Sequence, residues 1–171
     1  MDIRTVNTEN RICNAFLYLR ARNPIEDISV EELCSIARVK KPTFHNHYHN
    51  IYDLSDKLET RIVEDIVYSI QNPENIFNNP DAFTKEFFYA YKSKGENVSL
   101  VFSGSRAAML PQKTEYILKK RLFELYPDYE NDVEKNVMLS FKIYGGFYAL
   151  QVNKNYDADK VISIIISLNS Q

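Results

Sequence analysis

The sequence predicts an all-α protein of about nine helices. The 171 residues include only four Gly and six Pro, a composition that suits long helices. Apolar residues make up 44% and charged residues 26%, which is ordinary usage for a globular protein. Apolar positions recur with a period of about 3.6 residues, first at Val30, Leu33, Cys34 and Ala37. We therefore expect a three-helix head joined by a long fourth helix to a helical body.

Two short helices around a tight turn are the clearest feature of the head. Ser29 is a suitable N-cap for the first, which begins at Val30. Pro42 lacks an amide hydrogen and fits only the first turn of a helix, so the second begins at about Lys40 or Lys41. This helix-turn-helix pattern is typical of DNA-binding proteins.

The second of these helices has two different faces. Phe44 and Tyr48 share one face and belong to the core. Pro42, Thr43 and Asn46 project from the other face. Nothing in the pattern requires this outer face to be buried, so it is available to contact DNA.

The three histidines of the chain, His45, His47 and His49, lie in or just after this helix. Residues 45 and 49 share a face and residue 47 points elsewhere, so a metal would find only an i, i+4 pair. No nearby Cys or well-placed carboxylate completes a tetrahedral set. A metal site is therefore the weaker alternative. We expect no metal, no cofactor, and a DNA-facing role for at least two histidines.

This stretch resembles the DNA-binding domain of the TetR family of bacterial transcriptional regulators. The family pattern reads roughly apolar-Ala-x-x-Ala-Gly-Val-Ser-x-x-Thr-apolar-Tyr-x-His-Phe-x-x-Lys-x-x-Leu. It stands here as Leu33-Cys34, Ala37-Arg38-Val39-Lys40, Thr43-Phe44-His45-Asn46-His47-Tyr48 and Ile51-Tyr52-Asp53-Leu54. The chain has Arg38, Lys40, His45 and Ile51 where the family usually has Gly, Ser, Tyr and Lys. The resemblance covers roughly the first 70 residues.

The resemblance implies a homodimeric repressor that binds a double-stranded DNA operator and leaves it when a small ligand binds. The residues expected to contact DNA are Ser29, Val30, Lys40, Lys41, Pro42, Thr43, His45, Asn46 and His47. Of these, Lys40 and His45 contact phosphates, and Ser29 and Val30 approach from the supporting helix. The others meet base edges and the adjacent backbone in the major groove.

Charge by itself does not favour a DNA-binding head. Residues 1–60 contain 8 Lys or Arg and 9 Asp or Glu. Arg38, Lys40 and Lys41 cluster in the turn, whereas Glu31 and Glu32 lie on the preceding helix. We expect modest, salt-sensitive phosphate binding, with specificity from base contacts and dimerisation.

A polar segment with two prolines, residues 71–80, follows the connecting helix. We assign residues 1–50 to the helix-turn-helix domain and 51–171 to a regulatory and dimerisation domain. Its connecting helix is expected at about 51–71. The body helices are expected at about 81–94, 97–108, 111–125, 131–152 and 158–168, with Asp157 as N-cap of the last.

The last two expected helices, 131–152 and 158–168, carry much apolar surface. One stripe comprises Val133, Val137, Phe141, Tyr144, Tyr148 and Val152. The final helix is apolar around most of its circumference and must be buried on more than one side, for which a second copy is the natural cover. The body is similar to the C-terminal domain of the shorter TetR-type regulators of low-GC Gram-positive bacteria. That resemblance implies a four-helix bundle formed by these two helices and their symmetry mates.

Aromatic residues indicate where an effector would bind. Aromatics at helical spacing are usually core, but together they can line an apolar pocket with phenolic hydroxyls. The candidates for an apolar or aromatic ligand are Phe87, Tyr91, Phe102, Tyr116, Phe141, Tyr144 and Tyr148. Gly145 and Gly146 suggest either a close backbone approach, across an interface or beside a ligand, or a local kink.

Other classes of protein find less support. The sequence has no Gly-rich phosphate loop, no Gly-x-Ser-x-Gly elbow and no His outside the head, so we do not expect an enzyme. The most apolar run, residues 161–168, is far shorter than the ~20 residues of a membrane span, so we expect a cytoplasmic protein without a membrane partner. Glu31, Glu32, His45 and Ile51 keep one alternative open: a helical protein-interaction adaptor with a modified head.

Overall fold

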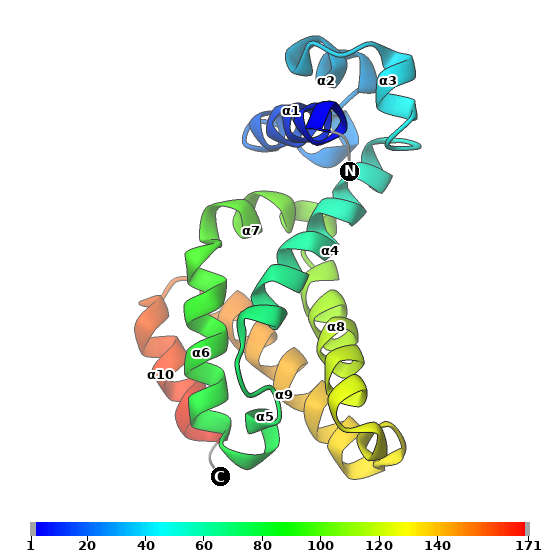
Figure 1. Ribbon diagram of the computed structural model, residues 1–171. Helices are drawn as coiled ribbons and strands as arrows, with labels where there is room; N and C mark the ends of the chain where they lie inside the picture. Colours follow the sequence, from blue (N-terminus) through cyan, green and yellow to red (C-terminus); the bar gives the residue numbers. More distant parts are fainter. Residues whose placement is uncertain (1–2, 170–171) are drawn as a thin grey trace. The chain divides into compact units, whose positions relative to one another are not determined.

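A computed structural model describes residues 3–169 of the protein, and within that range the chain forms ten α-helices and no strand (Figure 1). This confirms the all-α class. The first five helices are α1 (Ile3–Arg20), α2 (Val30–Ala37), α3 (Lys41–His45), α4 (Ile51–Ser69) and α5 (Asn75–Asn78). The others are α6 (Pro80–Ser93), α7 (Gly95–Val101), α8 (Met109–Leu125), α9 (Val133–Val152) and α10 (Ala158–Asn169). Three short 3₁₀ helices lie at η1 (Ile25–Asp27), η2 (Gly104–Arg106) and η3 (Pro127–Asn131).

Most helix bounds follow the sequence pattern, with two exceptions. Helix α5 lies within residues 71–80, which were expected to form only a polar break between helices. The single helix expected at 97–108 is instead α7, which ends at Val101, followed by η2. The prediction was wrong because Gly104 adopts a φ of 59°, which a continuous right-handed helix does not allow. The predicted N-cap of α10 is confirmed, since the Lys160 amide donates to Asp157 Oδ1 at 2.9 Å.

The chain divides into two compact units. The first contains the chain up to Ile62 together with Glu96–Ala108, and the second contains Val63–Gly95 together with the chain from Met109 on. The division therefore falls inside α4 rather than at the boundary expected after residue 50. It also places α7 beyond Gly95, with η2, in the first unit, which the sequence pattern did not suggest.

The first unit is built around the three N-terminal helices. Helix α1 packs on α2, and α2 packs on α3. Phe16, Leu33, Phe44 and Leu54 are fully buried and form the centre of its core. Because each comes from a different helix, burial of these side chains fixes the start of α4 together with the helix-turn-helix.

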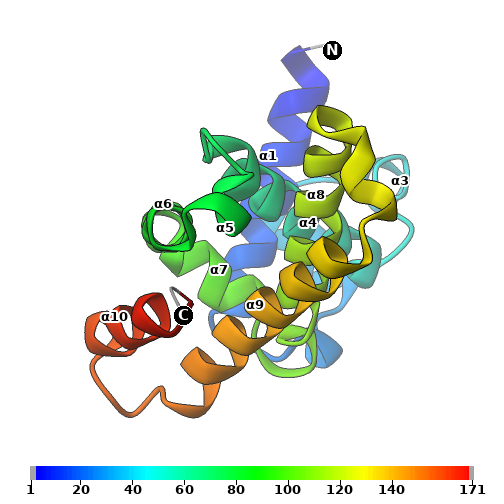
Figure 2. The same cartoon turned by 90° about the horizontal axis from the view of Figure 1, so that it is seen from below.

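The long helices α6, α8, α9 and α10 make up most of the second unit. Helix α10 lies beside both α6 and α9, and α8 packs against α9 (Figures 1 and 2). Its core includes Phe87 of α6, Leu118 of α8, Leu139 of α9 and Ile165 of α10. None of the described helices combines the length and apolar character needed to cross a membrane.

One apolar stripe of the second unit is left uncovered. Val133, Val137 and Phe141 on α9 are 75%, 63% and 76% exposed. Tyr148 on α9 and Leu168 on α10 are also largely exposed. The stripe expected on these helices therefore faces away from the core of its own unit.

Candidate nucleic-acid interface

Helix α2, which precedes the turn, is capped at both of its ends. Ser29 Oγ accepts a hydrogen bond from the Glu32 amide at 3.1 Å and caps α2, as its type predicts. Arg38 ends α2 in the left-handed region, at φ 53° and ψ 46°. Lys40 then adopts an extended conformation before α3 begins at Lys41. These local preferences set the angle at which α3 leaves the turn.

Helix α3 ends at His45, so Asn46, His47 and Tyr48, which were expected within it, lie in the turn that follows. Together, α3 and this turn have a buried side and an exposed side. Phe44 and Tyr48 are buried, and the Tyr48 hydroxyl lies 3.9 Å from Cys13 Sγ of α1. On the opposite side the exposed side chains are Lys40, Lys41, Pro42, His45 and Asn46, while Thr43 is partly exposed. Ser29 is exposed and Val30 partly exposed at the start of α2. Eight of the nine predicted DNA contacts therefore belong to an accessible surface of the head.

The ninth residue, His47, points elsewhere. Its Nδ1 lies 3.3 Å from Glu9 Oε1 of α1, and its side chain is only 15% exposed. Arg61 Nη2 approaches the other oxygen of Glu9 at 3.9 Å. This placement does not support the base contact expected for His47. The helical periodicity did not indicate this contact between His47 and Glu9, because Glu9 lies on a different helix.

The other two histidines, His45 and His49, have different surroundings. His45 is exposed on the outer face, whereas the His49 amide donates to Asp53 Oδ2 at 2.9 Å. Within the described chain, no three His, Cys, Asp or Glu side chains are placed to hold a metal ion.

The start of α4 is held by a reciprocal set of hydrogen bonds. Asn50 Oδ1 accepts from the Asp53 amide at 2.9 Å, and Asp53 accepts in turn from His49. Lys57 Nζ donates to the His47 carbonyl at 3.0 Å and to Asp53 at 3.1 Å. Ile51 is 5% exposed and packs in the core, so it presents no group to a phosphate. The turn that follows α3 is therefore rigidly joined to α4.

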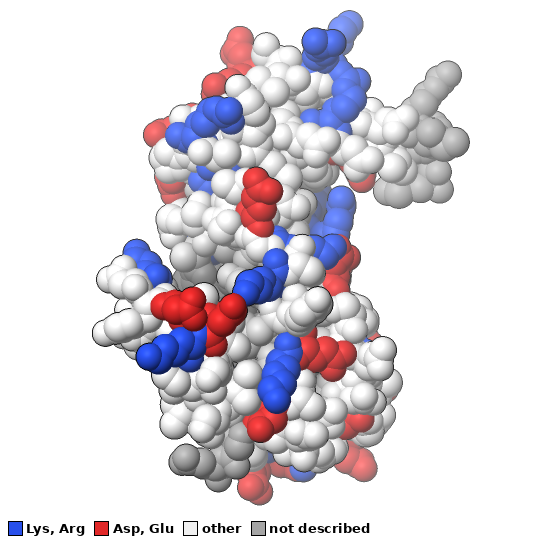
Figure 3. Space-filling view, turned by 90° about the vertical axis from the view of Figure 1, so that its left-hand side faces the viewer, with Lys and Arg blue, Asp and Glu red and all other residues white. Residues whose placement is uncertain are grey.

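The charge on the outer face is small. Lys41 Nζ lies 3.0 Å from Glu31 Oε2, and both side chains are exposed, so one of the turn's cations is paired within the head. Lys40 and Arg38 make no ion pair with any described residue. Elsewhere too, Lys and Arg alternate with Asp and Glu in small groups on the face shown in Figure 3. The head thus offers a few cations at the turn rather than a broad basic field.

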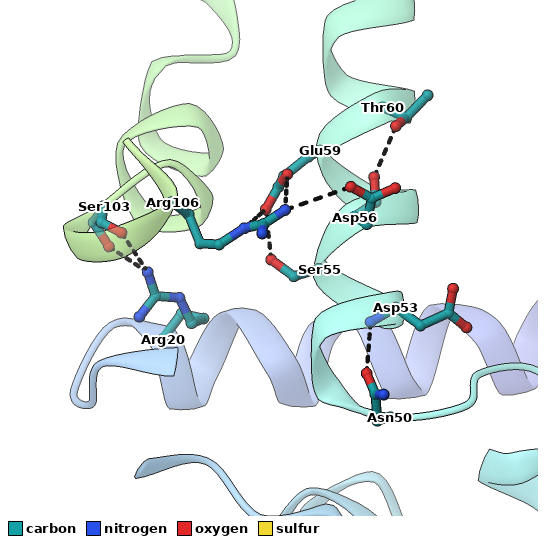
Figure 4. Close-up of polar contacts among 9 residues, drawn as sticks. All are labelled: Arg20, Asn50, Asp53, Ser55, Asp56, Glu59, Thr60, Ser103 and Arg106. Atoms are coloured by element: carbon teal, nitrogen blue, oxygen red, sulfur yellow. Dashed lines mark hydrogen bonds and ion pairs between the residues drawn. The ribbon is translucent and has the colours of Figure 1, made fainter. Parts of the chain in front are cut away.

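A buried ionic cluster joins α4 to η2 within the first unit (Figure 4). Glu59 is fully buried and accepts from Arg106 Nε at 2.7 Å and from Arg106 Nη2 at 2.6 Å. Ser55 Oγ donates to the same carboxylate at 2.7 Å. Asp56 Oδ1 lies 3.4 Å from Arg106 Nη2. The Glu59 hydrogen bonds raise the pKa of Arg106, so its guanidinium stays protonated.

Further polar contacts continue this cluster to α1 and η1. Arg20, which is 5% exposed, donates through Nη1 to the Asn23 carbonyl and through Nη2 to the Ser103 carbonyl at 3.2 Å. Ser105 Oγ donates to Glu26 Oε1. Sequence analysis did not identify this cluster. One signal was available: Glu59 interrupts the apolar stripe of α4 that continues through Ile62, Val63 and Ile66.

Comparisons with models of protein families, with curated proteins and with solved structures found no match.

The predicted ligand-binding residues are dispersed in the structure. Tyr116, Phe141, Tyr144 and Tyr148 are between 40% and 76% exposed on α8 and α9, so they are surface residues rather than pocket lining. Phe102 is buried in the first unit. The Tyr91 ring contacts Phe147, with 6.2 Å between centroids.

Phe87 alone of the seven lines an apolar cavity in the second unit. The cavity lies among α6, α8, α9 and α10, and its lining includes Phe83, Phe88, Lys142, Gly146 and Phe147. Most of the residues predicted to bind a ligand are exposed. On a helix with two apolar faces, periodicity alone does not show which face points into the core.

Proposed function

We propose that the protein is a sequence-specific, DNA-binding transcriptional regulator of the TetR type, a homodimeric repressor released from its operator by a small molecule. One observation carries the proposal: the exposed polar face of α3 lies opposite a buried aromatic face and is held by capped neighbours on both sides. This is how a recognition helix is presented to the major groove in helix-turn-helix proteins.

The side chains on this face suit base recognition. Asn46 offers an amide that pairs in bidentate fashion with adenine, and the Thr43 methyl group and Pro42 can pack on a thymine methyl. Lys40 is the unpaired cation nearest to the start of α3 and suits a phosphate. His47 is left out of the base contacts, because it is held by Glu9.

Repression by two heads requires a dimer. The exposed apolar stripe of α9 and α10 is the surface on which a second copy would pack. Two heads then match half-sites about 34–36 Å apart or a multiple of that repeat. A ligand in the second unit lowers operator affinity by the difference between its affinities for the two states, typically about 1–3 kcal/mol.

The proposal is tested first by selecting bound sequences from a random double-stranded DNA pool at about 100 mM salt. We expect enrichment of a palindrome with half-sites one helical turn or a multiple apart. A folded dimer that enriches no sequence would instead favour a protein-interaction adaptor, for which the exposed stripe of α9 is the supporting observation.

Substitution of Asn46 then tests the assigned face. Asn46→Ala should lose roughly 1–3 kcal/mol of discrimination at one operator position while the protein stays folded, because a bidentate base contact is removed. Asn97→Ala is the matched control, since Asn97 is exposed on α7. Competition binding with operator variants measures the effect. An Asn46→Ala protein with unchanged preference at every position would contradict the placement of α3 in the groove.

A further inference from the structure

The cavity of the second unit has apolar walls and one charged residue in its lining. Its walls include the rings of Phe83, Phe87 and Phe147, with centroid separations of 6.0 Å for Phe83 to Phe87 and 5.8 Å for Phe87 to Phe147. Lys142 of α9 is the only charged side chain among the described residues that line it. An ammonium group at an aromatic cavity needs a counter-ion, because burial of an unpaired charge is unfavourable.

Lys142 has no such counter-ion in the described chain. Its Nζ donates one hydrogen bond, to the Asn169 carbonyl of α10 at 3.1 Å, and makes no ion pair with a described carboxylate. Burial lowers the pKa of Lys142, and no charge of a described residue opposes this. An ammonium has three donors, so two remain for a ligand.

The rest of the rim has polar groups that are already paired with each other. Thr84 Oγ1 donates to the Pro80 carbonyl at 2.7 Å and accepts from Asn169 Nδ2 at 3.4 Å. Gly146 lies opposite Ile165, where a Cβ would come no closer than 4.0 Å to Ile165 Cγ2. The absence of a side chain at Gly146 therefore leaves space in the cavity near Lys142. No steric clash requires a glycine at this position.

The size of the cavity limits the ligand. Its volume is about 40 Å³, which is room for about three waters at 10–15 Å³ each. An apolar tail of about four carbons fills a comparable space. Larger aromatic effectors would require the phenylalanine rings to move.

We propose that this cavity binds a small aliphatic carboxylate, with the acyl tail among the phenylalanine rings and the carboxylate on Lys142. The inference rests on the proposed function only in taking this ligand to be the effector; the binding itself is independent of DNA. It replaces the apolar or aromatic ligand expected from the sequence with an aliphatic anion.

The test is calorimetric titration of the full chain, without DNA, with valerate, pentan-1-ol and pentylamine. Valerate should bind more tightly than the neutral alcohol, and pentylamine should bind least. In Lys142→Met the affinity for valerate should fall by about tenfold or more, the typical value of a charge-assisted hydrogen bond, while that for pentan-1-ol is unchanged. Lys142→Arg should keep most of the preference for the anion. Lys154→Met is the matched control, because Lys154 is exposed and does not line the cavity.

A second variant tests whether valerate and pentan-1-ol bind in this cavity. Gly146→Val fills the cavity and should weaken valerate and pentan-1-ol alike, while the melting curve shows that the protein is folded. Absence of valerate binding to the wild-type protein, or equal loss of valerate in Lys142→Met and Lys154→Met, would overturn the proposal. Release of the selected operator by valerate is measured separately. Valerate binding by a protein that selects no DNA sequence would overturn the proposed function and leave this site standing.

Discussion

At the scale of single residues, Arg38 is the most strained position in the head. It is the one non-glycine residue of the described chain with a positive φ, and its amide bonds back to the Cys34 and Ser35 carbonyls. An L side chain in this region is disfavoured by about 1 kcal/mol relative to glycine. Arg38→Gly should therefore raise the free energy of unfolding by about 1 kcal/mol, measured by urea denaturation.

Arg38→Ala is the control that separates strain from charge. Alanine keeps the Cβ and the left-handed strain but removes the guanidinium, so we expect little gain in stability. If alanine stabilised the protein as much as glycine does, the cause would be the positive charge beside Lys40 and Lys41. The backbone conformation would then have no part in the effect.

Residue-scale features were predictable where the signal is local. The positions of Ser29 and Pro42 fixed the helix starts, because capping and the missing proline amide act within one turn. The partners of His47 and Glu59 were not predictable, since Glu9 and Arg106 are distant in sequence. A single sequence holds no information on which distant charges meet.

At the scale of elements, the Arg106–Glu59 pair holds η2 to α4. Removing one partner of such a pair leaves a buried charge unpaired, which typically destabilises by about 3–5 kcal/mol. Since Arg106 is 15% exposed, we expect Arg106→Met to lower the free energy of unfolding by about 3 kcal/mol, the low end of that range. Denaturant unfolding followed by circular dichroism measures the change.

The double variant Glu59→Leu/Arg106→Met tests whether the loss of stability in Arg106→Met comes from the charge that remains. With both charges replaced by apolar groups, most of the lost stability should return, because no ion remains unpaired. Lys92→Met is a useful comparison: Lys92 pairs with Asp159 at 2.7 Å at the surface, and its loss should change stability far less than the loss of Arg106. A double variant as unstable as Arg106→Met would show that the shape of the arginine, and not its charge, matters.

The apolar periodicity predicted most of the helices. It did not predict to which compact unit each segment belongs. The apolar stripe of α4 continues from Ile62 through Val63 and Ile66, so nothing in the pattern marks a division after Ile62. Residues 96–108 belong to the first unit, where Arg106 of η2 pairs with Glu59 of α4 and Ser103, just before η2, accepts a hydrogen bond from Arg20 of α1. Such long-range pairing outweighs nearness in sequence in deciding which segments belong together.

At the scale of the whole molecule, we expect the uncovered stripe of α9 and α10 to determine the state of association. Val133, Val137 and Phe141 lie in one row on α9, each more than 60% exposed. Contiguous apolar surface of this kind is uncommon on monomers, and a stable interface buries about 1,200–2,000 Å² in total. We therefore expect the wild-type protein to be a dimer in analytical ultracentrifugation.

Phe141→Glu should convert that dimer to a monomer with its helical content intact, because a carboxylate would then be buried without a partner at the centre of the interface. Tyr89→Glu is the matched control: Tyr89 is 82% exposed on α6, outside the stripe, and should leave the dimer unchanged. The monomer keeps its recognition helix, so it should bind a single half-site weakly but lose the extra affinity for the palindrome that comes from linking two heads. A Phe141→Glu monomer that binds the palindrome as tightly as the wild type would show that one head suffices and that the stripe serves another partner.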